Sequence, residues 1–512
     1  MDGYSGKYIG FFLSMMTFAA MGQKSSAEAQ LPFQQKLSEG KSYIEKNAAD
    51  IHPFSFTIYA QNTAMNRAIP SEGKEYRKEI LLSSDFSKNH DLDNNDNFSP
   101  DGKWLVYDTR TESGGIGACS SIERIHTESG KTEILYHLAQ TEWYGPGVGA
   151  VSYHPTKEQV IFIHGLMNAS PELPYQQWRR TGVMIDTDQP GVARFLDARD
   201  ITAPFTPGAL RGGTHRHEWS RDGRWVGYTY NDAILQSLES ETSRSLNLRT
   251  IAVSAPFGRP AVVNDEKGEH IQGEYTSAVV VRVVPNPTPG SDEISHAASD
   301  SWVGSSGFLR SDGTRQVARA FLGRVLSEEG LAVDELFVVD IPEAIHLPGE
   351  AGPLEGTTQS MPAPPAGAQQ RRLTYTANSP YPGCYEVVRS SPDGNWISFV
   401  SKDREGIKQL YVIPPTGGIA QQVTFHSSDV QSGARWSHFN DKIIYVCENS
   451  IMMCEISEQP FSERAQRLTE PSAAPLSNLV WSADGSQIAF NRIVRYADVA
   501  TKQIYIVNLN SH

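Results

Sequence analysis

The chain lacks the short motifs that mark many enzyme classes. Its 512 residues contain no G-x-S-x-G nucleophile elbow, no phosphate-binding P-loop, no G-x-G-x-x-G and no H-E-x-x-H. Each motif places a nucleophile, a phosphate cradle or a zinc ion in a defined way. Their absence argues against an appended α/β-hydrolase, a nucleotide-binding domain of these types and a zinc peptidase.

Positive charge is also in short supply. The chain has 45 Lys and Arg against 59 Asp and Glu, which gives a net charge of −14. An acidic surface repels phosphate backbones, so we expect no nucleic-acid partner. A local basic pocket on such a protein can still bind an acidic sugar.

Cysteine is scarce as well, with only Cys119, Cys384, Cys447 and Cys454. An even number of cysteines in an exported chain allows two disulfides, and Cys447 could pair with Cys454 across a hairpin. Four buried thiols are the alternative, and the sequence does not decide between them. No spacing typical of a zinc site occurs.

One apolar run stands out, Tyr8–Gly22, which follows Lys7. It is short for a membrane span, and Ala27-Glu28-Ala29 behind it resembles a signal-peptidase site. We therefore predict a signal peptide over 1–29, cleaved after Ala29, rather than a membrane anchor. The mature protein is then periplasmic or secreted, with no membrane span.

The chain is rich in turn residues, with 42 Gly and 30 Pro, and they recur in a repeat. An aromatic or apolar residue is followed by Ser-x-Asp-Gly or a variant and then by alternating apolar residues. Asp-Gly favours a tight turn and the alternation favours a strand. The copies are FSPDGKWLVYDTR (98–110), YHPTKEQVIFIHG (153–165), WSRDGRWVGYTYND (219–232), SSPDGNWISFVSKD (390–403), WSHFNDKIIYVCE (436–448) and WSADGSQIAFNR (481–492).

Such a unit cannot bury both of its faces alone, so the units must stack around an axis. The repeat predicts an all-β fold, a single β-propeller of about seven four-stranded blades over 76–512, with six or eight as alternatives. In the gap between the third and fourth copies, 273–285 and 334–342 are interpreted as two strands of one degenerate blade. Arg77–Leu82 is expected to add an outer strand to the last blade and close the ring.

Four segments fall outside this pattern. Residues 30–75 form an N-terminal extension with one short helical signal. Residues 285–313 are expected to be a long loop that covers a channel mouth, and the Pro- and Gly-rich residues 341–370 a long surface loop. The Asp- and Asn-rich residues 91–102 lack the terminal Glu of an EF-hand, so we interpret them as a solvated loop.

Propeller geometry indicates where chemistry could occur. The inner strand of a blade runs down to the Ser-x-Asp-Gly turn and the second strand returns, so side chains before the turn and about ten residues after its Ser meet at one mouth. His215 and His217 lie two residues apart before such a turn and are expected to share a strand face. The other residues expected at this mouth are Arg110, His164, Arg211, Asp232 and Gln431.

This set supports two interpretations. His215 and His217 could hold a divalent metal such as Mn, Zn, Fe or Ni, with His164 as a third ligand or base. Arg110 or Arg211 could grip a carboxylate, and Asp232 and Gln431 could contact the substrate. Alternatively, the histidines only form hydrogen bonds between blades.

The repeat resembles the TolB-like, WD40-like (PD40) propeller repeat of periplasmic proteins. More specifically, 200–232, 151–165, 286–294, 362–376, 381–383 and 429–436 resemble the family called domain of unknown function 3748. That resemblance covers about 90–495. It implies a TolB-like propeller and no particular activity.

A more distant resemblance is to the oligogalacturonate lyases, which are seven-bladed and bind manganese through a Gln-x-x-His-x-His set. Here that segment contains His215 and His217, but Gly212 stands in place of the Gln. The resemblance implies a manganese-dependent lyase acting on acidic oligosaccharides. The competing hypothesis is a non-catalytic, TolB-like protein that binds a peptide or protein of the cell envelope.

Overall fold

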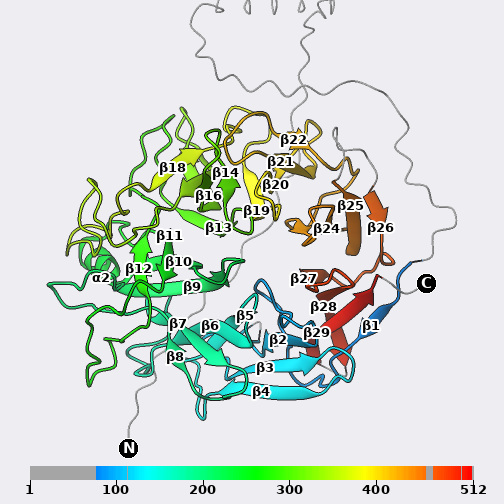
Figure 1. The fold of residues 1–512 in the computed structure, drawn as a ribbon, viewed down its shortest axis with the longest axis horizontal. Coiled ribbons are helices and arrows are strands. Elements are labelled where there is room, and N and C mark those ends of the chain that lie inside the picture. Colours follow the sequence, from blue (N-terminus) through cyan, green and yellow to red (C-terminus); the bar gives the residue numbers. More distant parts are fainter. Residues whose placement is uncertain (1–75, 112, 457–464, 497–498, 510–512) are drawn as a thin grey trace, which may run out of the picture. The chain divides into compact units, whose positions relative to one another are not determined.

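Seven sheets form a closed ring, as the repeat predicts. The computed structural model describes residues 76–111, 113–456, 465–496 and 499–509; the predicted signal peptide and the helix predicted within 30–75 lie outside them. Figure 1 shows the sheets arranged around a central axis, with strands such as β5, β9, β13, β19 and β27 nearest to it. Within the described residues, no helix is long and apolar enough to cross a membrane.

Blades 1 to 3 follow the chain from its N-terminal side. In blade 1, residues 91–98 take the inner position and pair irregularly with the next strand. Its remaining strands are β2 (Trp104–Asp108), β3 (Ser121–His126) and β4 (Thr132–His137). Blade 2 contains β5 (Val148–Tyr153), β6 (Gln159–Gly165), β7 (Arg180–Asp186) and β8 (Arg194–Phe195). Blade 3 contains β9 (Gly212–Trp219), β10 (Val226–Asp232), β11 (Thr250–Ala255) and β12 (Thr276–Val279).

Blades 4 to 7 complete the ring. Blade 4 contains β13 (Ala297–Trp302), β16 (Ala318–Leu326), β17 (Ala332–Asp340) and β18 (Gln369–Arg372), with an inserted hairpin of β14 (Phe308–Leu309) and β15 (Arg315–Gln316). Blade 5 contains β19 (Cys384–Ser390), β20 (Ile397–Lys402), β21 (Lys408–Ile413) and β22 (Gln421–Gln422). Blade 6 contains β23 (Arg435–Trp436), β24 (Lys442–Cys447), β25 (Ser450–Glu455) and β26 (Ala465–Arg467).

The last blade is closed by the first described strand. Blade 7 contains β27 (Leu476–Trp481), β28 (Gln487–Tyr496) and β29 (Val499–Asn508), and β1 (Glu79–Leu81) pairs with β29 as its outer strand. Glu79 also accepts hydrogen bonds from both Arg492 Nε and Nη2, at 2.7 and 2.6 Å. The predicted ring closure by 77–82 is therefore confirmed.

The Ser-x-Asp-Gly turns form as predicted, and their hydrogen bonds explain the repeat. In blade 1, Ser99 Oγ donates to Asp101 at 2.7 Å and accepts from the backbone N–H of Trp104 at 3.0 Å. Gly102 has a φ of 73°, a conformation that glycine adopts at little cost. The same bonds recur at Ser220, Ser391 and Ser482. In blade 2, His154 takes the serine position and its Nδ1 accepts from two backbone N–H groups.

The hydrophobic core lies between neighbouring blades. One cluster joins Val106 and Ile122 of blade 1 to Val148 and Phe162 of blade 2, all of them fully buried. Another joins β11 of blade 3 to β16 and β17 of blade 4. Each blade therefore buries its faces against the next one, which is the physical reason why a single repeat cannot fold alone.

Two predictions for the gap between the third and fourth copies are wrong. Residues 273–285 contain β12, the outer strand of blade 3, whereas 334–342 contain most of β17 in blade 4, so they do not belong to one blade. Residues 285–313 are not simply a loop, because they contain β13, the inner strand of blade 4. By contrast, 341–370 are mostly irregular and reach β18 only at Gln369.

The cysteines are free thiols rather than two disulfides. All four are buried. Cys447 and Cys454 do lie on a hairpin, but Cys447 is opposite Ser450 and Cys454 is opposite Ile443, so they do not face each other. Burial raises the pKa of Cys119 to about 12 and that of Cys454 to about 11. The alternative of four buried thiols is therefore the one that forms.

Candidate functional site

The inner strands share a bulge that the regular repeat does not reveal. In β9, His215 pairs with Thr229 and Glu218 with Gly227, so that Arg216 and His217 lie opposite the single residue Tyr228. Arg216 has a φ of 60°. Residues in the same left-handed region stand at the equivalent place, four positions before the turn's serine position, in other blades: Ala150, Ser299 and Asn478. An extra residue in one strand is the definition of a β-bulge.

The bulge changes the expected relation of His215 and His217, because it breaks the two-residue alternation between them. His217 is fully buried. Its Nε2 lies 3.0 Å from Thr214 Oγ1, and its ring packs against that of Tyr228 with centroids 5.1 Å apart. A Cβ on Gly182 of β7 would lie 2.6 Å from this Nε2. Burial lowers the pKa of His217 to about 3, so the ring is neutral.

His215 lies among positive charges. Burial lowers its pKa well below the ordinary value, and the charges of Arg180, Arg249, Arg216 and Arg110 lower it further. The same charges oppose a divalent cation and favour an anion. Among the described residues, no three His, Cys, Asp or Glu side chains are grouped so that they could hold a metal ion. This environment fits an anion better than a metal, and the metal site at His215 and His217 stays a prediction.

His164 and Arg110 are each held by local partners. His164 is buried in β6, where its Nε2 lies 3.0 Å from Tyr136 Oη. Arg110 Nε donates to Asp108 at 2.7 Å, and Nη1 forms an ion pair with Asp93 at 3.0 Å. No described contact brings His164 to the His215 and His217 pair. Its role as ligand or base, and that of Arg110 in substrate binding, stay predictions.

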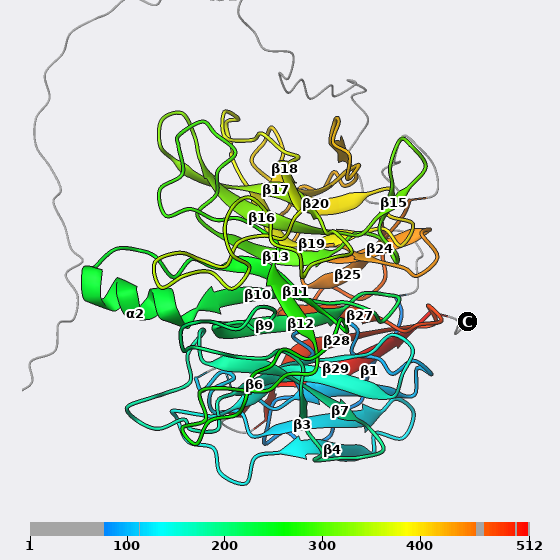
Figure 2. The same cartoon turned by 60° about the vertical axis from the view of Figure 1, so that its left-hand side comes forward.

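Arg211 and Asp232 form a buried ion pair, with side chains 1% and 0% exposed and an Nε to Oδ2 distance of 2.7 Å. Asp232 also caps α2 (Ala233–Thr242) by accepting from the N–H of Leu235, and Figure 2 shows α2 projecting from the blades. Arg211 Nη1 and Nη2 donate to the carbonyls of Thr357 and Ser360. The pair thus fastens the 341–370 loop to blade 3.

Gln431, the last of the predicted residues, is exposed. Its amide bonds with Asn449, accepting from the backbone N–H at 2.7 Å. Gln431 therefore contacts the β24–β25 turn rather than either histidine. Its contact with substrate stays a prediction.

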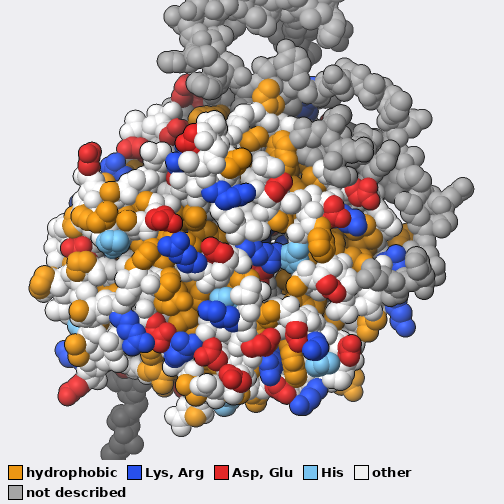
Figure 3. All heavy atoms as spheres, viewed as in Figure 1, with side chains coloured by type: hydrophobic (Ala, Val, Ile, Leu, Met, Phe, Trp, Pro, Cys, Tyr) orange, Lys and Arg blue, Asp and Glu red, His pale blue; other side chains and the backbone are white. Residues whose placement is uncertain are grey.

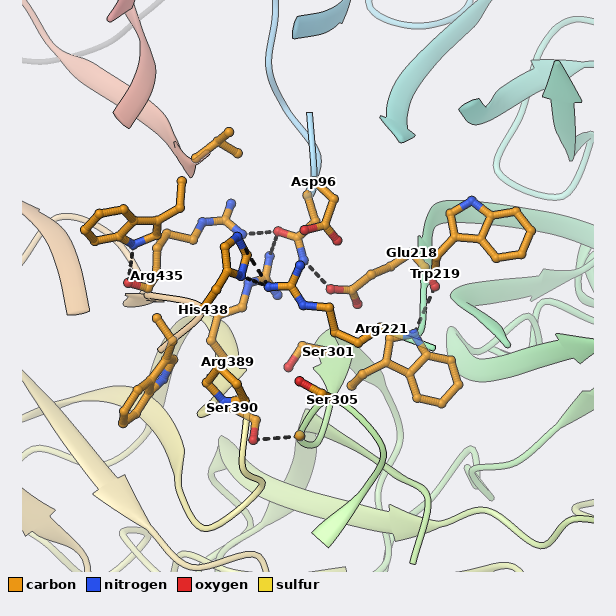
Figure 4. A pocket seen from close by; sticks show the side chains of 17 residues that line it. Asp96, Glu218, Trp219, Arg221, Ser301, Ser305, Arg389, Ser390, Arg435 and His438 are labelled. Carbon is orange, nitrogen blue, oxygen red and sulfur yellow. Dashed lines mark hydrogen bonds between the residues drawn. The ribbon is translucent and has the colours of Figure 1, made fainter. Parts of the chain in front are cut away.

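The structure also brings together a set of residues that the sequence analysis missed. A cavity of about 120 Å³ lies where the inner strands reach their turns. Its polar lining contains Asn95, Asp96, Glu218, Arg221, Ser301, Ser305, Arg389, Ser390, Arg435 and His438. Figure 4 shows labelled side chains from different blades, among them Asp96, Glu218, Arg221, Arg389, Arg435 and His438, directed toward one another. In Figure 3, cationic side chains and a histidine occupy the middle of this face.

Positive charge is in excess in the cavity. Arg221, Arg389 and Arg435 contribute three guanidinium groups, and Asp96 and Glu218 contribute two carboxylates. Glu218 already forms an ion pair with Arg319 at 3.0 Å. Burial lowers the pKa of Arg389 to about 10, and the pKa of Arg435 falls well below its usual value because of burial and the charge of Arg389. Uncompensated buried guanidinium groups are stabilised by an anion.

Hydrogen-bond donors in this cavity also lack partners. Among the described residues, Arg389 Nε and Ser301 Oγ are buried without a hydrogen-bond partner. Asn95 Oδ1 accepts from both Arg389 and Arg435, which holds the two guanidinium groups close together. Buried polar groups are normally satisfied, so unsatisfied donors beside a cavity indicate a ligand or ordered water.

Asp96 gives the cavity an acid group. It has a φ of 54°, which is uncommon for a residue other than glycine. Burial raises its pKa, against the opposing effect of Arg221. Backbone strain and a raised carboxyl pKa in a cleft are typical of functional residues.

The sequence did contain a signal for this site. Glu218, Ser301, Arg389 and Arg435 all lie in the inner strand two residues before the turn's serine position. Asn95 and Asp96 belong to the segment 91–102, for which a solvated loop was the wrong interpretation. That segment replaces a regular inner strand in blade 1, and Asn94, Asn95 and Asn97 are buried there.

Comparisons with known proteins place the chain in a family. A family model described as protein of unknown function (DUF3748) matches residues 147–270. The uncharacterized protein YidR of Escherichia coli K12 is 38% identical over 411 residues, which cover 79% of this chain and 92% of that protein.

Solved structures resemble the chain more remotely. An oligogalacturonate lyase from Vibrio parahaemolyticus is 10% identical, with a TM-score of 0.49 and coverage of 85% of this chain and 94% of that one. A protein from Agrobacterium tumefaciens that is described as a putative TolB is 13% identical, with a TM-score of 0.34 and coverage of 77% of this chain and 99% of that one. The match to YidR extends over most of both chains, and on that ground the protein belongs to the DUF3748 family.

Proposed function

We propose that the protein is an exported propeller that binds an acidic oligosaccharide through the arginine-lined cavity. The observation that carries this proposal is the cluster of Arg221, Arg389 and Arg435 around one cavity, with only two carboxylates to balance it. Arginine binds carboxylates through two parallel N–H bonds. Export is proposed from the apolar run Tyr8–Gly22 and the Ala27-Glu28-Ala29 site.

Several features favour a carboxylate ligand over a neutral one. Arg389 Nε and Ser301 Oγ are buried donors without partners, and a carboxylate accepts hydrogen bonds without donating any. Burial raises the pKa of Asp96 against the opposing effect of Arg221, which weakens its ability to balance the guanidinium charge. A neutral sugar would leave the positive charge of the cavity uncompensated.

The direct test is calorimetric titration of the mature protein with a galacturonate trimer and with the neutral galactose trimer. We expect the acidic trimer to bind and the neutral one not to bind, because only the first balances the guanidinium charge. The affinity should also fall as salt is added. Equal binding of both trimers would contradict the proposal, and so would binding of neither. The second outcome would leave the envelope-protein hypothesis, to be pursued by crosslinking in envelope extracts.

A metal-dependent lyase acting on the same ligand class is the second candidate, and metal analysis decides it. We expect the purified protein to contain less than one equivalent of Mn, Zn, Fe or Ni, because the arginines around His215 repel a dication. The measurement is elemental analysis, beside a folded variant with His215→Ala and His217→Ala. One equivalent in the native protein and none in the variant would contradict this expectation and support the lyase.

A further inference from the structure

We propose a second anion-binding subsite centred on Arg180 of β7, beside the bulged part of β9. Arg180 is only 4% exposed, yet its Nε and Nη2 have no hydrogen-bond partner among the described residues. Its Nη1 donates to Tyr175 Oη at 3.2 Å. A buried guanidinium with two unsatisfied N–H donors is costly unless an acceptor binds to it.

The packing of β7 against β9 locates this group. A Cβ on Gly182 would lie 2.6 Å from His217 Nε2, and a Cβ on Gly213 would lie 2.2 Å from the carbonyl of Gln177. The segment 177–182 therefore runs alongside 213–217. Arg180 lies two residues before Gly182 in a strand of regular register, so the Arg180 side chain leaves β7 on the face where a Cβ of Gly182 would lie. Arg180 thus faces the bulged part of β9, next to His215.

Other cationic side chains near His215 add to the positive charge of Arg180. The charges of Arg110, Arg216 and Arg249, together with that of Arg180, lower the pKa of His215. Arg249 Nε also donates a hydrogen bond to Asn231 Oδ1 at 3.2 Å. The charge of Arg216 also lowers the pKa of Arg389 and of Arg435 in the cavity. Cationic side chains therefore lie on or beside β9 from Arg180 through the bulge to the cavity, and of these Arg110 is already paired with Asp108 and Asp93.

The distance between the arginines near His215 and those of the cavity indicates the class of ligand. His215 and Glu218 of β9 pair with Thr229 and Gly227, which lie two residues apart on β10, so the bulged stretch spans about 7 Å along the strand. A ligand that reaches both groups of arginines needs negative charges on more than one unit. The inference rests on the proposed function and deepens it, because it selects a chain of acidic units over a single acidic sugar.

The test compares affinities for galacturonate monomer, dimer and trimer in the native protein and in Arg180→Gln. We expect the native protein to bind the trimer about tenfold or more tightly than the monomer, and Arg180→Gln to lose most of that ratio. The matched control is Arg282→Gln, an exposed arginine, which should keep the ratio. Thermal unfolding of each variant confirms that it is folded, and the uncharged Arg180→Met is the second variant if Arg180→Gln is not folded.

The outcomes separate the two proposals. If the monomer and trimer bind the native protein equally, the second subsite is wrong while the cavity proposal stands. The same conclusion follows if a folded Arg180→Gln or Arg180→Met keeps the full ratio. If no acidic ligand binds, the proposed function itself fails.

Discussion

Replacement of both Arg389 and Arg435 by glutamine is expected to weaken binding of the galacturonate trimer by at least about 100-fold, because each guanidinium supplies charge-assisted hydrogen bonds worth about 1.5–3 kcal/mol. The two groups are bridged by Asn95 and lie next to the unsatisfied Ser301 Oγ. Glutamine keeps part of the volume and some hydrogen-bonding capacity but removes the charge. The measurement is calorimetric titration at low and at moderate salt.

The control for this experiment must change the net charge equally. Arg282→Gln with Arg315→Gln removes two exposed guanidinium groups and should change the affinity by less than about twofold at moderate salt. If both double variants weaken binding to the same extent, the effect comes from the overall charge and the cavity is not the site. If neither does, the ligand binds elsewhere.

Arg211→Met is expected to lower the free energy of unfolding by about 3–5 kcal/mol, because it leaves the carboxylate of Asp232 buried without its partner. Both side chains are at most 1% exposed. The substitution also removes the donors that Arg211 offers to the carbonyls of Thr357 and Ser360. Urea unfolding followed by tryptophan fluorescence measures the loss.

Two further variants show whether the loss of stability comes from breaking the ion pair of Arg211 and Asp232. Arg224→Met breaks an ion pair in which Arg224 and Glu343 are 44% and 82% exposed, and it should cost less than about 1 kcal/mol. Adding Asp232→Asn to Arg211→Met should recover much of the loss, since asparagine still caps a helix but carries no charge. A cost for Arg211→Met no larger than that for Arg224→Met would show that the ion pair contributes little.

The ring of blades was predictable because each regular turn is stabilised by hydrogen bonds between residues close together in the sequence. Ser99, Ser220, Ser391 and Ser482 each anchor the same local hydrogen bonds, so the repeat appears directly in the sequence. Blade 4 escaped prediction because its turn position holds Val303 followed by the inserted β14–β15 hairpin. Without the Ser-x-Asp-Gly signal, 334–342 was recognised as a strand but grouped with the wrong segment, and β13 was predicted to be part of a loop.

The site was harder to predict, because it depends on contacts between residues far apart in the chain. His215 and His217 were placed on the correct strand, but the bulge at Arg216 depends on register with β10. Arg211 pairs with Asp232 and grips a loop some 146 residues away, which no local pattern indicates. The cavity joins Asn95 to Arg435, separated by 340 positions.

The bulge that recurs at Ala150, Arg216, Ser299 and Asn478 has a consequence for how such a protein can diversify. Each of these residues lies on the strand nearest the axis, at a point where the ladder of backbone hydrogen bonds is already interrupted. A substitution there changes a side chain of an inner strand while the flanking ladder keeps its register. Relatives with the same ring could therefore evolve different ligand preferences by substitutions at single bulge positions. The left-handed backbone conformation limits which residue types these positions accept.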